Sequence, residues 1–143
     1  AKENLDVGEV LGAGLYALGG GLQFSGLRPA APVFSGGAYG KLESIVGLER
    51  HHMPANSISP LSLGKGPAIQ MTKDDHALTA SYGSSKSAVA YREEVRELIN
   101  AGRWRDALAK EIQDVREVAG AKYNSAIREM LDYARGRGLL VKP

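Results

Sequence analysis

Three apolar stripes at helical spacing fill the C-terminal part of the chain and constrain its fold more than any other feature. They span residues 91–99, 104–119 and 123–134, with apolar side chains recurring every three or four positions. Such a recurrence places the apolar side chains on one face of an α-helix, so each stripe predicts an amphipathic helix. A glycine follows each stripe within a few residues, as is typical of helix C-termini. The sequence therefore predicts a bundle of about three helices.

The segment before these helices carries the signals of strands and of one short helix. An apolar run that begins at Leu42 ends in Glu-Arg-His-His at residues 49–52, and a proline-containing loop follows. Residues 67–71 predict a short strand, because the proline at its start is tolerated there. Thr72 or Asp74 then offers an N-cap for a helix that carries His76. We expect an α+β fold that is mostly helical.

The N-terminal stretch differs from the rest because more than half of the 18 glycines fall within residues 1–40. Each glycine in a helix costs about 1 kcal/mol relative to alanine, so a triple-glycine run such as residues 19–21 disfavours a long helix. We interpret residues 1–36 as a Gly-rich linker or arm and residues 37–143 as the folded domain.

Composition narrows the chemistry that this domain can perform. The chain has no cysteine, which excludes disulfides, Cys-ligated zinc, iron–sulfur clusters and a thiol nucleophile. The formal net charge of +2 permits contact with a polyanion without requiring one. No apolar run approaches the roughly 18 residues that a membrane span needs. Because the chain has no cysteine, any metal must be held by histidine and carboxylate side chains.

All three histidines fall in one short stretch, at positions 51, 52 and 76. Histidine is the commonest metal ligand and titrates near neutral pH, so the adjacent pair His51-His52 can supply one ligand and one base. The plainer alternative is two surface histidines and a third at a helix start, all without function. The proline-containing loop after the pair, and the strand followed by an Asp-Asp-His helix start, favour a metal site. We expect the three imidazoles to converge on one cation.

Three short motifs follow one another across residues 49–79. They are Glu-Arg-His-His-Met-Pro at 49–54, Gly-Pro-Ala-Ile-Gln-Met at 66–71, and Asp75-His76 with Thr79. Together they resemble the HNH/endonuclease VII superfamily of nucleases, in the His-His-type branch found as C-terminal toxin domains of bacterial polymorphic toxins and secretion-system effectors. The likeness extends over roughly residues 37–135. It implies a small ββα-metal core, a hairpin followed by a helix, ahead of the three predicted helices.

The resemblance implies a role for each histidine. In that family the first residue of the pair ligates a divalent ion and the second is the general base, which implies His51 as a ligand and His52 as the catalytic base. His76 would be the second metal ligand, and Asp75 a weaker candidate for a further ligand or for an orienting partner. The family often has a second helical histidine four residues away, and this chain has none there. The implied cofactor is one divalent metal ion, Mg²⁺, Mn²⁺, Ni²⁺ or Zn²⁺.

Substrate contacts are expected from basic and small polar residues near these motifs. A glycine beside a serine at residues 83–84 exposes backbone N–H groups that can bind a phosphate at the start of the next helix. A plain helix cap is an equal alternative for that segment. The expected nucleic-acid-binding residues are Arg50, Lys65, Lys73, Ser84 and Lys86.

The implied function is a metal-dependent DNase that hydrolyses phosphodiester bonds as an antibacterial toxin. The implied partners are DNA, an acidic immunity protein, and the larger toxin polypeptide of which this chain would be the C-terminal part. We expect secretion or injection by the producing bacterium and action in the cytoplasm of the target cell. Two alternatives stay open: an RNase on the same scaffold, and a non-enzymatic helical module that binds a partner and holds a structural metal.

Overall fold

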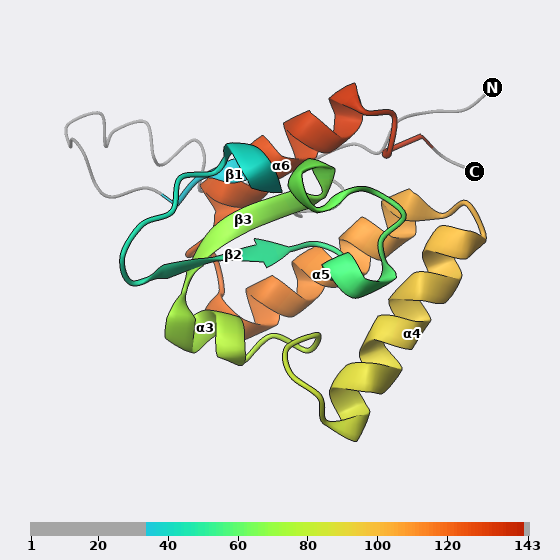
Figure 1. Cartoon of the computed structure of the whole chain (residues 1–143), viewed down its shortest axis with the longest axis horizontal. Helices are drawn as coiled ribbons and strands as arrows, with labels where there is room; N and C mark the ends of the chain where they lie inside the picture. The colour runs from blue at the N-terminus through green and yellow to red at the C-terminus, as the bar shows by residue number, and fades with distance from the viewer. Residues whose placement is uncertain (1–33, 142–143) are drawn as a thin grey trace.

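A three-stranded antiparallel sheet with α-helices packed against it makes up the computed structural model, which describes residues 34–141 (Figure 1). The strands are β1 (Gly36–Ala38), β2 (Leu48–His52) and β3 (Pro67–Thr72). The helices are α3 (Lys73–Ala77), α4 (Lys86–Asn100), α5 (Trp104–Ala119) and α6 (Asn124–Gly136). Short 3-10 turns lie in the connections at η2 (Tyr39–Lys41), η3 (Asn56–Ile58) and η4 (Leu63–Lys65). The fold class is therefore α+β, as the sequence predicts.

The sheet has the order β1-β3-β2, so β2 is an edge strand and β3 lies between its neighbours. Strand β1 was not expected, because its glycines read as the end of a linker. Gly36 pairs with Ile69 across the sheet. A Cβ at Gly36 would lie 1.9 Å from the carbonyl oxygen of Ala126, so the glycine lets α6 approach the strand closely. The rest of the expected arm, residues 1–33, lies outside the described residues.

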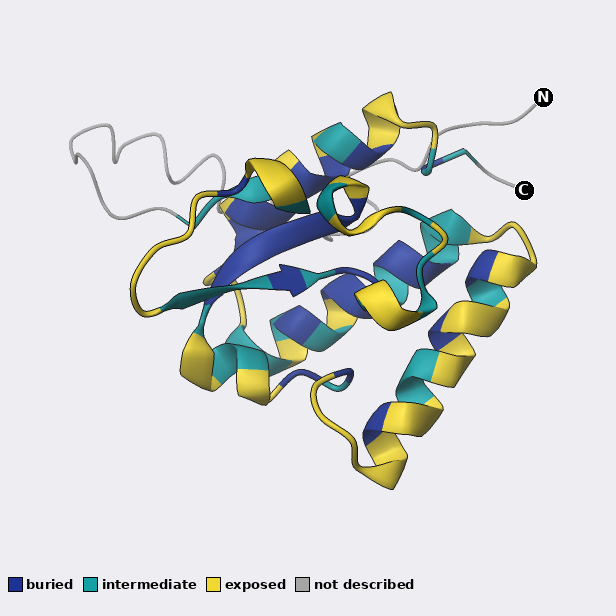
Figure 2. Cartoon of the chain, in the orientation of Figure 1, coloured by how far each residue is buried: buried dark blue, intermediate teal, exposed yellow. Residues whose placement is uncertain are grey.

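The main core forms where helices α5 and α6 cover one face of the sheet. Ile69 and Met71 of β3 are fully buried against Leu108 and Ile112 of α5 and against Ile127 of α6. Figure 2 shows β3 buried along most of its length, whereas α4 exposes much of its surface. The three predicted helices are present, but α5 and α6 share their core with the sheet instead of forming a separate bundle.

Local capping fixes the short helix α3 directly after β3. The Thr72 side chain accepts a hydrogen bond from the Asp75 N–H at 3.2 Å, which confirms one of the two predicted N-caps. The helix is therefore rigidly joined to the central strand, and it carries His76 back towards β2. Among the helices of residues 34–141, none has the length and apolar character to cross a membrane.

Candidate functional site

The two adjacent histidines of β2 point to opposite faces of the sheet, because successive side chains of a strand alternate. His51 pairs with Ile69, and Glu49 pairs with Met71. Directly paired residues share a face, so Glu49 and His51 lie on the side that the helices cover. Arg50 and His52 lie on the other side.

His51 is almost completely buried, with 2 % of its surface exposed. Its ring lies 5.0 Å from the ring of His76, at an interplanar angle of 58°. Within residues 34–141, its buried Nε2 has no hydrogen-bond partner. Burial, helped by the nearby His76 and His52, lowers the pKa of His51 to about 3. The imidazole is therefore neutral near pH 7, and it keeps an unused nitrogen inside the protein.

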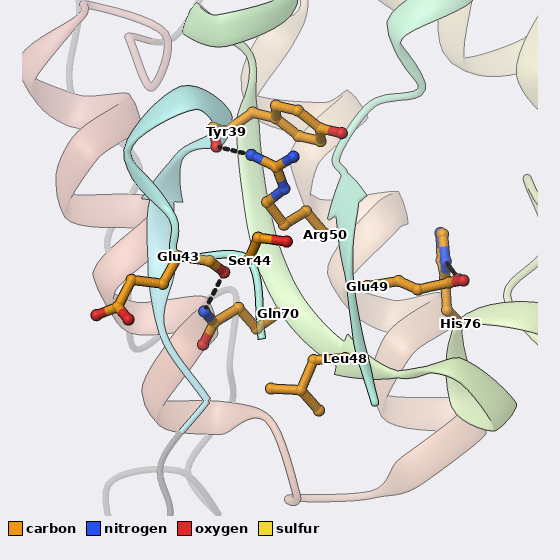
Figure 3. Close-up of a pocket in the computed structure, with 8 residues that line it drawn as sticks. All are labelled: Tyr39, Glu43, Ser44, Leu48, Glu49, Arg50, Gln70 and His76. Atoms are coloured by element: carbon orange, nitrogen blue, oxygen red, sulfur yellow. Dashed lines mark hydrogen bonds and ion pairs between the residues drawn. The ribbon is translucent and has the colours of Figure 1, made fainter. Parts of the chain in front are cut away.

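His76 is held by Glu49 from the neighbouring strand. The Nδ1 of His76 lies 2.7 Å from the Glu49 Oε1, as Figure 3 shows. A carboxylate accepts this hydrogen bond, so Nδ1 carries the proton and Nε2 of the neutral ring is left as an acceptor. The ring of Tyr82 meets His76 edge-on, with centroids 5.0 Å apart. This carboxylate–histidine arrangement is the one that commonly orients a metal-binding imidazole.

His52 does not join the other two imidazoles. Its ring stacks on Tyr39 with centroids 3.9 Å apart and nearly parallel planes. Its Nε2 lies 2.9 Å from the Leu63 carbonyl oxygen, which can only accept, so Nε2 carries the proton and Nδ1 is unprotonated in the neutral ring. Burial lowers the pKa of His52, partly offset by the Leu63 hydrogen bond, and the charge of Arg50 lowers it further. The expected convergence therefore holds for the His51 and His76 rings and not for the His52 ring.

A cleft of about 210 Å³ runs along the edge strand β2. Its lining includes Arg50, His51 and His52 of the strand, Asn56 of η3, and His76 and Tyr82 from the segment after β3. A second hollow of about 330 Å³, drawn in Figure 3, shares Arg50 and His76 with this cleft. The two hollows thus meet at a cationic side chain and at the carboxylate-bound histidine.

Asp75, a candidate metal ligand from the sequence, has its carboxylate engaged by residues at the start of α6. Its Oδ2 accepts hydrogen bonds from the Tyr123 hydroxyl at 2.6 Å and from the Lys122 ammonium at 2.8 Å. The hydrogen bond from Lys122 is the largest cause that lowers the pKa of Asp75, followed by that from Tyr123. These contacts tie α3 to the start of α6, which is a structural role.

The donor set of the cleft fits a divalent cation only in part. Across residues 34–141, no group of three His, Cys, Asp or Glu side chains is arranged to hold a metal ion. His51, with its orphaned buried Nε2, and His76, with its Nδ1 bound by Glu49, form a two-imidazole pair. Water and phosphate oxygens readily complete the shell of a hard or borderline divalent ion. Two imidazoles alone would leave most coordination positions of such an ion to water or to other oxygen ligands.

The expected nucleic-acid contacts come from several different elements. Of the five, only Arg50 lines either hollow. Its guanidinium lies 4.2 Å from the centroid of the Tyr39 ring, and Nη1 donates to the Tyr39 carbonyl at 3.3 Å. The other four expected contacts are exposed: Lys65 in η4, Lys73 at the start of α3, Ser84 before α4 and Lys86 at the start of α4.

The sequence did not predict that Glu49 binds His76 or that Asn56 lines the cleft. The spacing of Glu49 two positions before His51 is the signal that could have found it, because alternate strand residues share a face. For the segment before α4, the structure has the plainer alternative: the Ser85 side chain accepts the Ala88 N–H and caps the helix. No family model, curated protein or solved structure matches this chain.

Proposed function

We propose that this domain is a divalent-metal-dependent endonuclease that cleaves phosphodiester bonds in the cleft along β2. The observation that carries the proposal is the fully buried His51, with an unpaired Nε2, set against the carboxylate-bound His76. An orphaned buried nitrogen costs stability unless a ligand uses it. The chain order of two antiparallel strands, β2 and β3, followed at once by α3 supports a ββα-metal core.

In this proposal His51 and His76 hold the metal, and Glu49 orients His76. When bound, the ion neutralises the charge of the scissile phosphate and stabilises the leaving oxygen. Asp75 keeps its bonds to α6 and stays outside the metal shell. The two protein ligands leave room for phosphate oxygens, so the substrate itself helps to complete the site.

His52 is the proposed general base. The Leu63 carbonyl fixes the ring proton on Nε2, which leaves Nδ1 to take the proton of the attacking water. Its lowered pKa keeps the ring neutral at pH 7, as a base requires. The stacking on Tyr39 restricts the orientation of the ring.

Arg50 is the proposed phosphate contact closest to the reacting centre, because it lines both hollows. Its guanidinium is held against Tyr39, so little side-chain entropy is lost when it binds an anion. The exposed Lys65, Lys73, Ser84 and Lys86 are proposed as outer contacts to the nucleic-acid backbone. Such contacts add affinity without sequence preference.

The direct test is cleavage of a supercoiled plasmid by the wild-type chain, with EDTA and with Mg²⁺, Mn²⁺, Ni²⁺ or Zn²⁺ restored. We expect nicking that EDTA abolishes and a divalent ion restores. His51→Ala should lose this activity, whereas Asp75→Asn, a control for the carboxylate outside the cleft, should keep it. Undiminished cutting in EDTA would reject the metal-dependent mechanism.

A metal-free RNase is the second candidate, and the His76 ring, whose Nδ1–H is bound by Glu49, favours it because within residues 34–141 its Nε2 faces no such partner. The Glu49–His76 pair could then accept the proton of a ribose 2′-hydroxyl, since His76 Nε2 is left as an acceptor. This alternative predicts RNA cleavage in EDTA and products that end in a 2′,3′-cyclic phosphate. Absence of cleavage of both DNA and RNA would favour a non-enzymatic partner-binding module.

The biological setting follows from the resemblance and not from the geometry. We infer that the domain is the C-terminal toxin part of a secreted or injected polypeptide that acts in the cytoplasm of a target bacterium. The producing cell would then need an immunity protein, acidic because it must cover a phosphate-binding surface. Co-expression of the adjacent open reading frame should relieve toxicity and co-purify with the domain.

A further inference from the structure

The loop at residues 78–85 forms one wall of the cleft. It contributes Ser81, Tyr82 and Gly83 to the lining. Tyr82 meets the His76 ring edge-on, with centroids 5.0 Å apart and planes at 77°. With 46 % of Tyr82 exposed, burial alone does not fix the position of this ring, so the hydrogen bonds of its loop also determine where it lies.

Arg92, on the first half of α4, fixes the backbone on both sides of Tyr82. One of its terminal nitrogens, Nη1, donates to the Ser81 carbonyl at 2.6 Å and to the Gly83 carbonyl at 2.8 Å. Hydrogen bonds from a charged guanidinium are about twice as strong as neutral ones. The two carbonyls flank Tyr82, so a single side chain sets the local path of the loop.

Asp114, on α5, holds the same loop one residue earlier. Its Oδ2 accepts the Ala80 N–H at 2.8 Å. The hydroxyl of Thr79 in turn donates to the His76 carbonyl at 2.8 Å, which links the loop to the end of α3. Three consecutive residues before Tyr82 are therefore bonded to α3, α5 and α4 in turn.

We propose that Arg92 and Asp114 are positioning residues that clamp loop 78–85 and thereby hold Tyr82 against His76. Glu49 binds Nδ1 of the His76 ring, and the Tyr82 ring meets the same ring edge-on. The two contacts together restrict the rotation of the His76 ring. Neither Arg92 nor Asp114 lines the cleft, so each acts on His76 only through the loop. The helical layer of α4 and α5 thus has a part in shaping the site. The consequence for cleavage rests on the proposed function, whereas the consequence for the His76 ring does not.

The experiment compares Arg92→Ala and Asp114→Ala, which removes the acceptor of the Ala80 N–H, with two matched controls. Arg96→Ala lies one helical turn further along α4 and removes a side chain that pairs with Glu93 on the surface. Asp132→Ala removes the surface partner of Arg135 on α6. The primary readout is the NMR chemical shift of the His76 ring protons in the metal-free protein, which the ring current of Tyr82 perturbs. Tyr82→Ala supplies the shift expected when the contact is lost.

We expect both clamp variants to move the His76 ring signals towards the Tyr82→Ala values, and both controls to leave them at the wild-type values. If the wild-type chain cleaves nucleic acid, kcat of the clamp variants should fall about tenfold, the lower end of the range for partners that orient a metal ligand. Should Arg92→Ala fail to fold, Arg92→Met keeps a long unbranched side chain but has no donor for the two carbonyls, and its His76 shift decides.

Two outcomes separate the clamp from the proposed function. If the clamp variants displace the His76 signals and the wild-type chain cleaves no nucleic acid, the shifts support the clamp and the inactivity rejects the nuclease. Wild-type His76 signals in Arg92→Ala and Asp114→Ala, in a chain that does cleave, overturn the clamp and leave the nuclease intact.

Discussion

His51 and His52 are neighbours in the chain and occupy two unlike environments. The His51 ring lies on the helix-covered side of the sheet, with an unpaired Nε2 and the His76 ring beside it. The His52 ring lies on the other side, half-buried between the Tyr39 ring and the Leu63 carbonyl. The difference shows how the alternation of one edge strand places a buried imidazole and a half-exposed one at the same cleft. In the proposed mechanism, the first is a metal ligand and the second is the general base.

We expect the largest change in kcat from His52→Ala. Loss of a general base lowers kcat by about 10²–10⁴-fold, whereas the metal site on the other face stays intact. His51→Ala should instead weaken metal binding. Calorimetric metal titration beside single-turnover cleavage separates the two. Equal loss of metal affinity in both variants would mean that the two imidazoles share one role.

Glu49→Gln tests whether metal binding by His76 depends on the carboxylate that accepts its Nδ1–H. Loss of the charged acceptor should weaken metal affinity by about 10–100-fold, because the ring loses its orienting partner. Glu43→Gln is the control, since the Glu43 side chain is exposed and its backbone carbonyl, not its carboxylate, accepts the hydrogen bond from Gln70. Unchanged affinity in Glu49→Gln would remove Glu49 from the site.

The pH dependence of stability should distinguish the two histidines in metal-free protein. The pKa of His51 falls from 6.5 to about 3 on folding. At pH above 6.5 the His51 ring is neutral in both the folded and the unfolded state, so its protonation takes nothing from the free energy of unfolding. As the pH falls from 6.5 towards 3, only the unfolded chain takes up the proton, which costs about 1.4 kcal/mol of stability per pH unit.

Urea unfolding at pH 7, 6 and 5 in EDTA measures this dependence. His51→Gln should show a shallower loss of stability towards acid pH than the wild type. His52→Gln should keep a steeper loss than His51→Gln, because the His51 ring is still present. Parallel curves for wild type and His51→Gln would contradict the sealed environment of His51.

Gly66→Ala is expected to have the smallest effect and to act on the His52 side alone. A Cβ there would lie 2.9 Å from the Cδ2 of His52, so the ring must shift. We expect about 1 kcal/mol of destabilisation from overpacking and a lower kcat, with metal affinity unchanged. Gly64→Ala is the matched control, because its Cβ would meet only the Gly40 Cα, at 3.8 Å. A normal kcat in Gly66→Ala would show that the His52 orientation does not matter.

The helices, β3 and the cap of α3 could be predicted because each depends on local pattern. Apolar periodicity marks α4, α5 and α6, and Thr72 at the end of an apolar strand marks the start of α3. Strand β1 could not be predicted, since Gly36 is there to admit α6, and a close approach between distant segments leaves no local pattern.

The candidate site was predictable in its members more than in its arrangement. Sequence proximity grouped the three histidines, and the alternation of β2 then separated His52 from His51. Asp75 was an expected ligand, but Tyr123 and Lys122 from the far end of the chain hold it elsewhere. The bonds of loop 78–85 to α4 and α5 join residues that no spacing rule relates.

Addition of Mn²⁺ during NMR of ¹⁵N-labelled imidazoles tests whether His51 and His76 share a metal site, because a bound paramagnetic ion broadens the signals nearest to it. We expect the ring signals of His51 and His76 to broaden together at low Mn²⁺, with His52 affected less, and EDTA to restore all three. Broadening of His52 alone, or no selective broadening of any ring, would contradict a metal site between β2 and α3.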